Sequence, residues 1–185
     1  MIEIKLSGRG GQGAVLASQI LGSAFFKIGN WVQSFPSFGA ERRGAPVSAF
    51  LRVDTKEITL RYGVKHPEWL VLFDPGLVKN KMVMDGVRSD TSIIVNSTEP
   101  AGKGRFGLEQ RLFIVDATSI AEGLNLRTTS FSIVNTAMVG AFAKASGLID
   151  LDSVSAAIGE LVPVKKEENI AAAKEAYGKV KEVSL

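Results

Sequence analysis

Apolar and polar side chains follow two different periods along this chain, and the period changes from segment to segment. Residues 2–7 alternate as a half-buried strand does, and residues 12–28 carry apolar side chains at helical intervals. The segments 69–73, 92–95 and 112–115 are short, continuous apolar runs, which are typical of strands buried on both faces of a sheet. The pattern predicts an α/β fold in which these runs are central strands.

A β-hairpin is expected near the middle of the chain, where the side chains alternate again. Residues 46–53 alternate, residues 58–62 repeat the alternation, and residues 54–56 between them are typical of a turn. Because a hairpin is antiparallel, the sheet is expected to be mixed rather than purely parallel. Residues 31–35 form a further extended segment that leads into an irregular stretch.

The last third of the chain is predicted to be helical. Helices are expected at residues 132–146, 151–161 and 167–181. The lysines and glutamates of the last helix are expected to face solvent, with the docking of a partner as the alternative. Because the sequence has no internal repeat and no low-complexity linker, we expect a single domain over residues 1–185.

Two aspartates follow buried strands and are expected to cap helices. Asp74 precedes Pro75, which suits the first turn of a helix, and Asp116 sits in the same way at the end of its strand. The alternative is a role in a ligand site, since such sites gather at the carboxyl ends of strands in α/β sheets.

Composition narrows the chemistry that the chain can perform by itself. The 185 residues include no cysteine and one histidine, His66. Without cysteine there is no disulfide, no thiolate nucleophile and no cysteine-ligated iron–sulfur cluster, and one histidine cannot build a histidine-rich zinc site. We therefore assign no catalytic residue and no metal site. Either carboxylates, hydroxyls, lysines or arginines do the chemistry, or the cofactors belong to a partner.

The charge and hydropathy of the chain indicate neither nucleic acid nor membrane as a partner. Lysine and arginine number 22 against 19 acidic residues, a net charge of +3, but these charges are scattered rather than gathered in a basic arm. The first residues alternate like a strand, unlike a signal peptide. Residues 131–149 lack the run of about 20 apolar side chains that a membrane span needs. We expect a cytoplasmic protein.

The strongest local motif lies between the first strand and the first helix. Its residues are Gly8, Arg9, Gly10, Gly11, Gln12 and Gly13. Glycines let a backbone turn tightly and approach a ligand, and the free N–H groups of a helix start attract an anion. The motif contains GxGxxG, but residues 31–37 offer no acidic residue for ribose hydroxyls, so dinucleotide binding is the weaker interpretation. A tight turn without a ligand is the alternative.

A second polar segment follows the second extended stretch. Here Glu41, Arg42, Arg43 and Gly44 lie among further glycines and prolines. Guanidinium groups in such a loop suit a phosphate or carboxylate, which they bind through paired hydrogen bonds. The alternative is a surface loop with an internal pair between glutamate and arginine. A doubly wound topology would place this loop beside the glycine motif, and the two would then form one anion-binding cleft.

Five segments, in order, resemble the gamma subunit of 2-oxoacid:ferredoxin oxidoreductases. The segments are GRGGQGAVLASQILGSAFFKIG, FPSFGAERRGAPVSAFLRV, FDPGL, VDATSIA and NTAMVGAFAKASGLI. The resemblance covers nearly the entire chain and is strongest to the pyruvate and branched-chain (ketoisovalerate) types. It implies a three-layer α/β/α fold with a mixed, mostly parallel sheet.

The resemblance also implies a place in a larger enzyme. Complexes of this family decarboxylate a 2-oxoacid, pass electrons to ferredoxin and transfer the acyl group to coenzyme A. Their alpha and beta subunits bind thiamine diphosphate with Mg, and a delta subunit carries iron–sulfur clusters, which agrees with a chain that has no cysteine. The preferred 2-oxoacid is left open.

For this chain, the resemblance implies a role in closing the active site and engaging coenzyme A. Residues 8–13 and 41–44 would meet its phosphates. Alternatively, Arg42 and Arg43 pair with carboxylates of the alpha or beta subunit and serve assembly. A function of another class is a stand-alone nucleotide- or phosphate-binding protein that uses the glycine motif.

Overall fold

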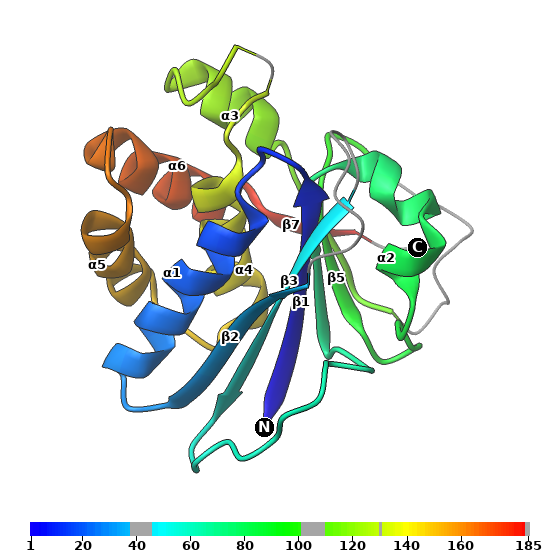
Figure 1. Ribbon diagram of the computed structural model, residues 1–185. Helices are drawn as coiled ribbons and strands as arrows, with labels where there is room; N and C mark the ends of the chain where they lie inside the picture. Colours follow the sequence, from blue (N-terminus) through cyan, green and yellow to red (C-terminus); the bar gives the residue numbers. More distant parts are fainter. Residues whose placement is uncertain (38–45, 101–109, 130, 184–185) are drawn as a thin grey trace.

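A mixed β-sheet forms the centre of the molecule (Figure 1). The computed structural model describes residues 1–37, 46–100, 110–129 and 131–183. Within these ranges the sheet has seven strands in the order β2-β3-β1-β4-β5-β6-β7. The strands are β1 (Ile2–Arg9), β2 (Trp31–Ser37), β3 (Pro46–Asp54), β4 (Trp69–Leu72), β5 (Ser92–Asn96), β6 (Leu112–Val115) and β7 (Lys181–Val183).

Parallel and antiparallel pairings are equally common in this sheet. The strands β1, β4, β5 and β6 pair in parallel, whereas β3 is antiparallel to both β1 and β2, and β7 is antiparallel to β6. The predicted mixed sheet is confirmed, although three of the six pairings are antiparallel and the sheet is less parallel than expected.

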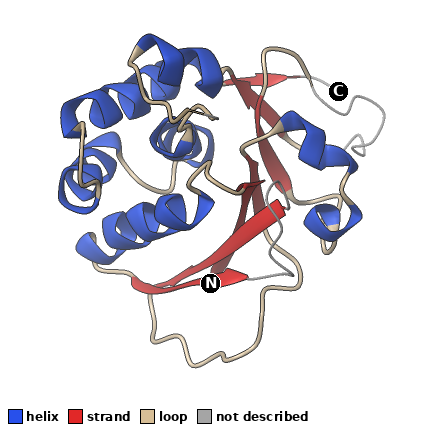
Figure 2. Ribbon diagram, turned by 45° about the horizontal axis from the view of Figure 1, so that its top comes forward, coloured by secondary structure: helices blue, strands red, loops and turns tan. Residues whose placement is uncertain are grey.

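Helices cover the two faces of the sheet unequally (Figure 2). One face carries α1 (Ala14–Lys27), α4 (Asn135–Ser146), α5 (Leu151–Leu161) and α6 (Lys166–Lys179), with α3 (Ala117–Gly123) beside them. The other face carries the short 3-10 helix η1 (Pro75–Lys79) and α2 (Lys81–Met84). The predicted three-layer arrangement is confirmed, with one thick and one thin outer layer. No helix in the described ranges is long and apolar enough to cross a membrane.

The continuous apolar runs are explained by two separate cores, one on each face. In β4, Trp69 and Val71 join the core under the thick helical layer, and Leu70 and Leu72 join the core under η1 and α2. All four side chains are buried. The predicted central strands are therefore confirmed, since each must be apolar on both sides.

The predicted hairpin after β3 is wrong. Residues 58–62 form no strand, because β3 is already paired along one edge with β1 and along the other with β2. With no free edge to extend, this segment runs as a loop, and its Leu60 carbonyl accepts a hydrogen bond from Gln33 Nε2 at 3.0 Å.

Both predicted aspartate caps are confirmed. Asp74 accepts a hydrogen bond from the backbone N–H of Gly76 at 2.8 Å at the start of η1. Asp116 accepts one from Ser119 at 2.9 Å and begins α3. The sequence patterns missed β7, because a three-residue strand is too short to show alternation.

The helices α4 and α6 meet most closely at Gly140. A Cβ atom on Gly140 would lie 2.0 Å from the backbone oxygen of Ala173, which belongs to α6. That distance is far below any van der Waals contact, and a helix backbone cannot yield as the end of a side chain can. The packing of α4 on α6 therefore depends on a residue without a side chain.

Replacing Gly140 with alanine is expected to lower the free energy of unfolding by about 1–3 kcal/mol, because the added methyl group does not fit between α4 and α6. The matched control is Gly178→Ala in α6, where an added Cβ meets nothing within 4 Å. Alanine there should leave stability unchanged or raise it by up to about 1 kcal/mol. Urea unfolding of both variants checks the prediction, and equal midpoints would contradict it.

Candidate functional site: a glycine turn at the carboxyl end of β1

The predicted glycine motif forms the turn between β1 and α1. Gly11 and Gly13 have φ angles of 98° and 84°, in the left-handed region that favours glycine. The turn is closed by a hydrogen bond from Gln12 N to Arg9 O at 3.0 Å. The Gln12 side chain closes it a second time, since its Oε1 accepts from Arg9 N at 2.7 Å. The turn is thus held in one shape by its own residues.

The first turn of α1 has no side-chain cap. Gly13 is the N-cap residue, and within the described ranges no side chain accepts a hydrogen bond from the N–H groups that follow it. The first N–H groups of a helix have no partner within the helix, and they carry the positive end of its dipole. The start of α1 therefore has N–H donors of the kind that an anion needs, and anion binding by the glycine motif stays a prediction.

Arg9 is less available to an anion than the sequence suggests. Its Nε lies 2.6 Å from Asp74 Oδ2, and its Nη2 lies 3.5 Å from Asp74 Oδ1. This hydrogen bond, with the charge of the same carboxylate, raises the pKa of Arg9. The ion pair neutralises the guanidinium and ties the glycine turn to the start of η1. Arg9 therefore holds the turn in position, and its charge is already balanced.

Two residues that sequence reasoning did not select complete the surroundings of the turn. A Cβ on Gly13 would lie 2.7 Å from Nδ2 of Asn135, and a Cβ on Gly11 would lie 3.3 Å from the ring of Phe131. Asn135 is buried at the start of α4, so the beginnings of α1 and α4 meet at this turn. The sequence signal that could have indicated Asn135 is its position as a polar residue at the start of a helix whose other side chains are mostly small or apolar.

The described residues on either side of the second predicted motif lie beside this turn. In the sheet, Pro46 is the partner of Arg9, and Ser37 and Ser7 both pair with Ser48. The chain thus leaves β2 and re-enters β3 at the same edge of the sheet at which β1 ends. Glu41, Arg42, Arg43 and Gly44 themselves lie outside the described residues. Their position next to the glycine turn remains a prediction.

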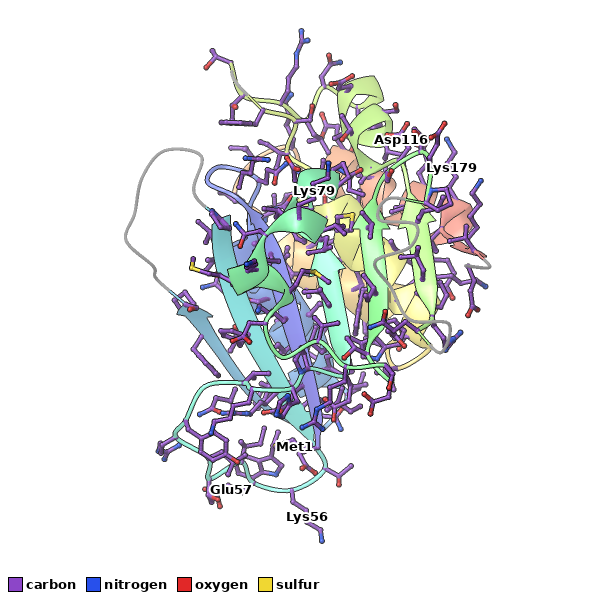
Figure 3. The ribbon with its side chains drawn as sticks, turned by 90° about the vertical axis from the view of Figure 1, so that its right-hand side faces the viewer. Met1, Lys56, Glu57, Lys79, Asp116 and Lys179 are labelled. Atoms are coloured by element: carbon purple, nitrogen blue, oxygen red, sulfur yellow. The ribbon has the colours of Figure 1, made fainter. Side chains whose placement is uncertain are left out.

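The carboxyl ends of the four parallel strands all lie at one end of the sheet. Figure 3 shows Asp116 and Lys79 at the end where the parallel strands finish, and Met1, Lys56 and Glu57 at the opposite end. The glycine turn follows the last residue of β1 and belongs to the first of these ends. Ligands of α/β proteins bind beyond the carboxyl ends of the strands, so the turn lies where a site is expected.

The residues of this chain do not fit an iron–sulfur cluster, and those that the structure describes do not gather as metal ligands. Iron–sulfur clusters need thiolate ligands, and the sequence has no cysteine. In the described part of the chain, no three histidine or acidic side chains gather as they would around a metal ion. What the site offers is backbone N–H donors at a helix start.

Comparison with known proteins identifies the family. The family described as pyruvate ferredoxin/flavodoxin oxidoreductase matches residues 3–179. The chain belongs to this family. It is similar to pyruvate synthase subunit PorC of Methanocaldococcus jannaschii, with 43% identity over 181 residues and 97% of each chain covered. It is also similar to the pyruvate/ketoisovalerate oxidoreductases common subunit gamma of Thermococcus kodakarensis, with 45% identity over 183 residues and 97% of each chain covered.

Solved structures share the fold of this chain. Pyruvate oxidoreductase subunit PORC of Thermotoga maritima is 31% identical, with a TM-score of 0.81 over 97% of each chain. A 2-oxoglutarate:ferredoxin oxidoreductase from Magnetococcus marinus has a TM-score of 0.72 at 18% identity, and 96% of this chain matches 30% of that longer one. The resemblance drawn from the sequence motifs is confirmed: this chain is a gamma subunit of a pyruvate or related 2-oxoacid:ferredoxin oxidoreductase.

In this gamma subunit, the glycine turn should tolerate a side chain at Gly10 and reject one at Gly13. Gly13→Ala forces a left-handed φ of 84° on alanine and presses its Cβ onto Asn135, so we expect stability to fall by about 1–3 kcal/mol. A Cβ at Gly10 meets nothing within 4 Å, so Gly10→Ala should change stability by less than about 0.5 kcal/mol. Denaturant unfolding measures both, and a fully stable Gly13→Ala variant would contradict the assigned turn geometry.

Proposed function

We propose that this gamma subunit closes the active site of its oxidoreductase complex and binds the phosphates of coenzyme A. The observation that carries the proposal is the uncapped start of α1 at Gly13, next to the points where the chain enters and leaves the loop that contains Arg42 and Arg43. Two kinds of anion-binding group would then face the same region, one from the backbone and one from side chains.

Physical chemistry favours a phosphate ligand there. A helix start carries roughly half a positive charge and offers N–H groups that point along the helix axis. Arginine adds paired, charge-assisted hydrogen bonds to phosphate oxygens. Coenzyme A carries several phosphate oxygens that could accept hydrogen bonds from both kinds of donor. The related Magnetococcus marinus enzyme, which contains a segment of this fold, was solved with coenzyme A bound.

The other chemistry of the complex is assigned to partner subunits. We propose that thiamine diphosphate and Mg are held by alpha and beta subunits, and iron–sulfur clusters by a delta subunit that reduces ferredoxin in the cytoplasm. The absence of cysteine from this chain supports that division. The task left for this chain is to position coenzyme A and to keep water away from the acyl group until it is transferred.

Changing both Arg42 and Arg43 to alanine in the assembled complex is expected to raise the apparent KM for coenzyme A at least tenfold. Removal of a charge-assisted hydrogen bond costs about 1.5–3 kcal/mol, and 1.4 kcal/mol corresponds to a factor of about ten. The KM for the 2-oxoacid should not change, since its carbon skeleton is recognised elsewhere. Steady-state kinetics with a viologen dye as electron acceptor measures both constants.

The control variant is Arg88→Ala, since Arg88 is exposed on the loop before β5 and has no part in the proposed site. An intact complex whose coenzyme A dependence is unchanged would overturn the assignment of these arginines. If the double variant instead fails to co-purify with its partner subunits while Arg88→Ala assembles normally, the loop serves assembly.

A further inference from the structure

A cavity of about 530 Å³ lies on the face of the sheet opposite the thick helical layer, and Lys5, which lines it, has no part in the proposed function. Lys5 and Phe50 contribute to its lining from neighbouring strands, and Met82 and Asp85 from α2 and the residue after it. We call this space the Lys5 cavity. Its volume falls within the range of about 300–1,000 Å³ that small-molecule sites occupy.

Lys5 is a buried cation that is held by backbone oxygens. Its side chain is on a central strand, and the residue is only 6% exposed. In the described part of the chain no acidic side chain forms an ion pair with it. Its Nζ donates hydrogen bonds to the backbone oxygens of Met82 and Asp85, at 3.2 and 3.3 Å. An ammonium group has three N–H donors, so one remains for another acceptor.

Burial of this charge is unfavourable as it stands. Desolvation lowers the pKa of Lys5, and the nearby charge of Asp85 only partly opposes that shift. A buried charge is normally balanced by an opposite one, because its loss of hydration is not repaid by neutral groups alone. Among the described residues, the charged groups that line the cavity are Lys5, Lys65 and Asp85, two cations against one anion. This described lining has a net positive charge, which suits a negative ligand.

The walls of the cavity favour a small organic acid. Phe50, Val64 and Met82 give it apolar surface, and the Phe50 ring centre lies 5.9 Å from Lys5 Nζ. We propose that the Lys5 cavity binds a small organic carboxylate, whose oxygens accept the remaining N–H of Lys5 and whose short carbon chain packs against Phe50 and Met82. Lysine binds such a group as a point charge and needs no second donor in a fixed plane.

The Lys5 cavity is separate from the start of α1 but reaches the ends of the loop that contains Arg42 and Arg43. Lys5 precedes Arg9, the last residue of β1, by four positions, which corresponds to about 13 Å along a strand. Ser37 and Pro46, the described residues on either side of that loop, line the cavity. The two proposals are tested on different residues, Lys5 for the carboxylate and Arg42 with Arg43 for coenzyme A, so the failure of one is distinguishable from the failure of the other.

Titration of the full-length chain with sodium propionate, at constant ionic strength, tests the proposal. We expect saturable binding with a millimolar Kd, followed by NMR shifts of the Lys5 side chain, and a rise in the pKa of its amine when propionate is bound. Inorganic phosphate should bind at least several-fold more weakly, because it has no carbon chain for the apolar wall. Equal or tighter binding of phosphate would overturn the assignment to a carboxylate.

Lys5→Met should weaken propionate binding at least tenfold, since methionine fills similar space without the charge. The matched control is Lys79→Met, an exposed lysine of η1 on the same face, which should bind propionate as the unaltered chain does (Figure 3). If Lys5→Met does not fold, Asp85→Asn provides the second test, because removal of the competing carboxylate should tighten binding several-fold. No saturable binding by the unaltered chain, or equal binding by Lys5→Met, would show that Lys5 only fastens α2 to the sheet.

Discussion

The pairing of β1 with two different neighbours is the constraint on which the rest of the structure depends. From Ile2 to Arg9 this strand is paired antiparallel with β3, and its central part is paired in parallel with β4. The first pairing brings the chain back from residues 38–45 to the place where β1 ends. The second makes β1 the first of four parallel strands, so the glycine turn opens at the end where their carboxyl termini gather. The glycine turn and the described ends of the 38–45 segment therefore lie at the same end of the sheet.

The unequal helical layers explain why the two faces of the sheet have different chemistry. The core under η1 and α2 consists of residues from these helices and from β4, β5 and β6, with other apolar side chains packed against it. This core contains no residue of β1 or β3, and polar side chains are buried on that part of the face. Arg52 of β3 is fully buried there, with Nε 2.7 Å from Glu3 Oε1 and its guanidinium 5.5 Å from the centre of the Phe35 ring. The β1 and β3 strands take no part in the apolar core on this face, and their polar side chains are paired with one another instead.

The local sequence pattern was sufficient to predict most helices and strands, but it could not predict which strands pair with one another. The central strands, the helix starts at Asp74 and Asp116 and the glycine turn follow from short-range physics: burial on two faces, capping and backbone freedom at Gly13. Alternation after β3 is equally real, but whether such a segment becomes a strand depends on a free sheet edge. That edge is occupied by β2, a fact that only the tertiary fold decides. The burial of Lys5 could not be predicted either. Alternation along a strand predicts on which face of the sheet a side chain lies, but not which residues cover that face.

The two cations of β1, Arg9 and Lys5, are paired in the opposite way from what stability alone would favour, since the exposed one has a carboxylate partner and the buried one has none in the described part of the chain. Arg9, which is partly exposed, has a carboxylate partner in Asp74, where water would have screened its charge and the pair contributes little. Lys5, which is buried, has carbonyl oxygens and no ion pair among the described residues, where an opposite charge would matter most. An apolar residue at position 5 would avoid that cost, as Ile4 and Leu6 do on the other face of the same strand. An unbalanced ammonium group beside a cavity makes physical sense if the missing negative charge arrives with a ligand.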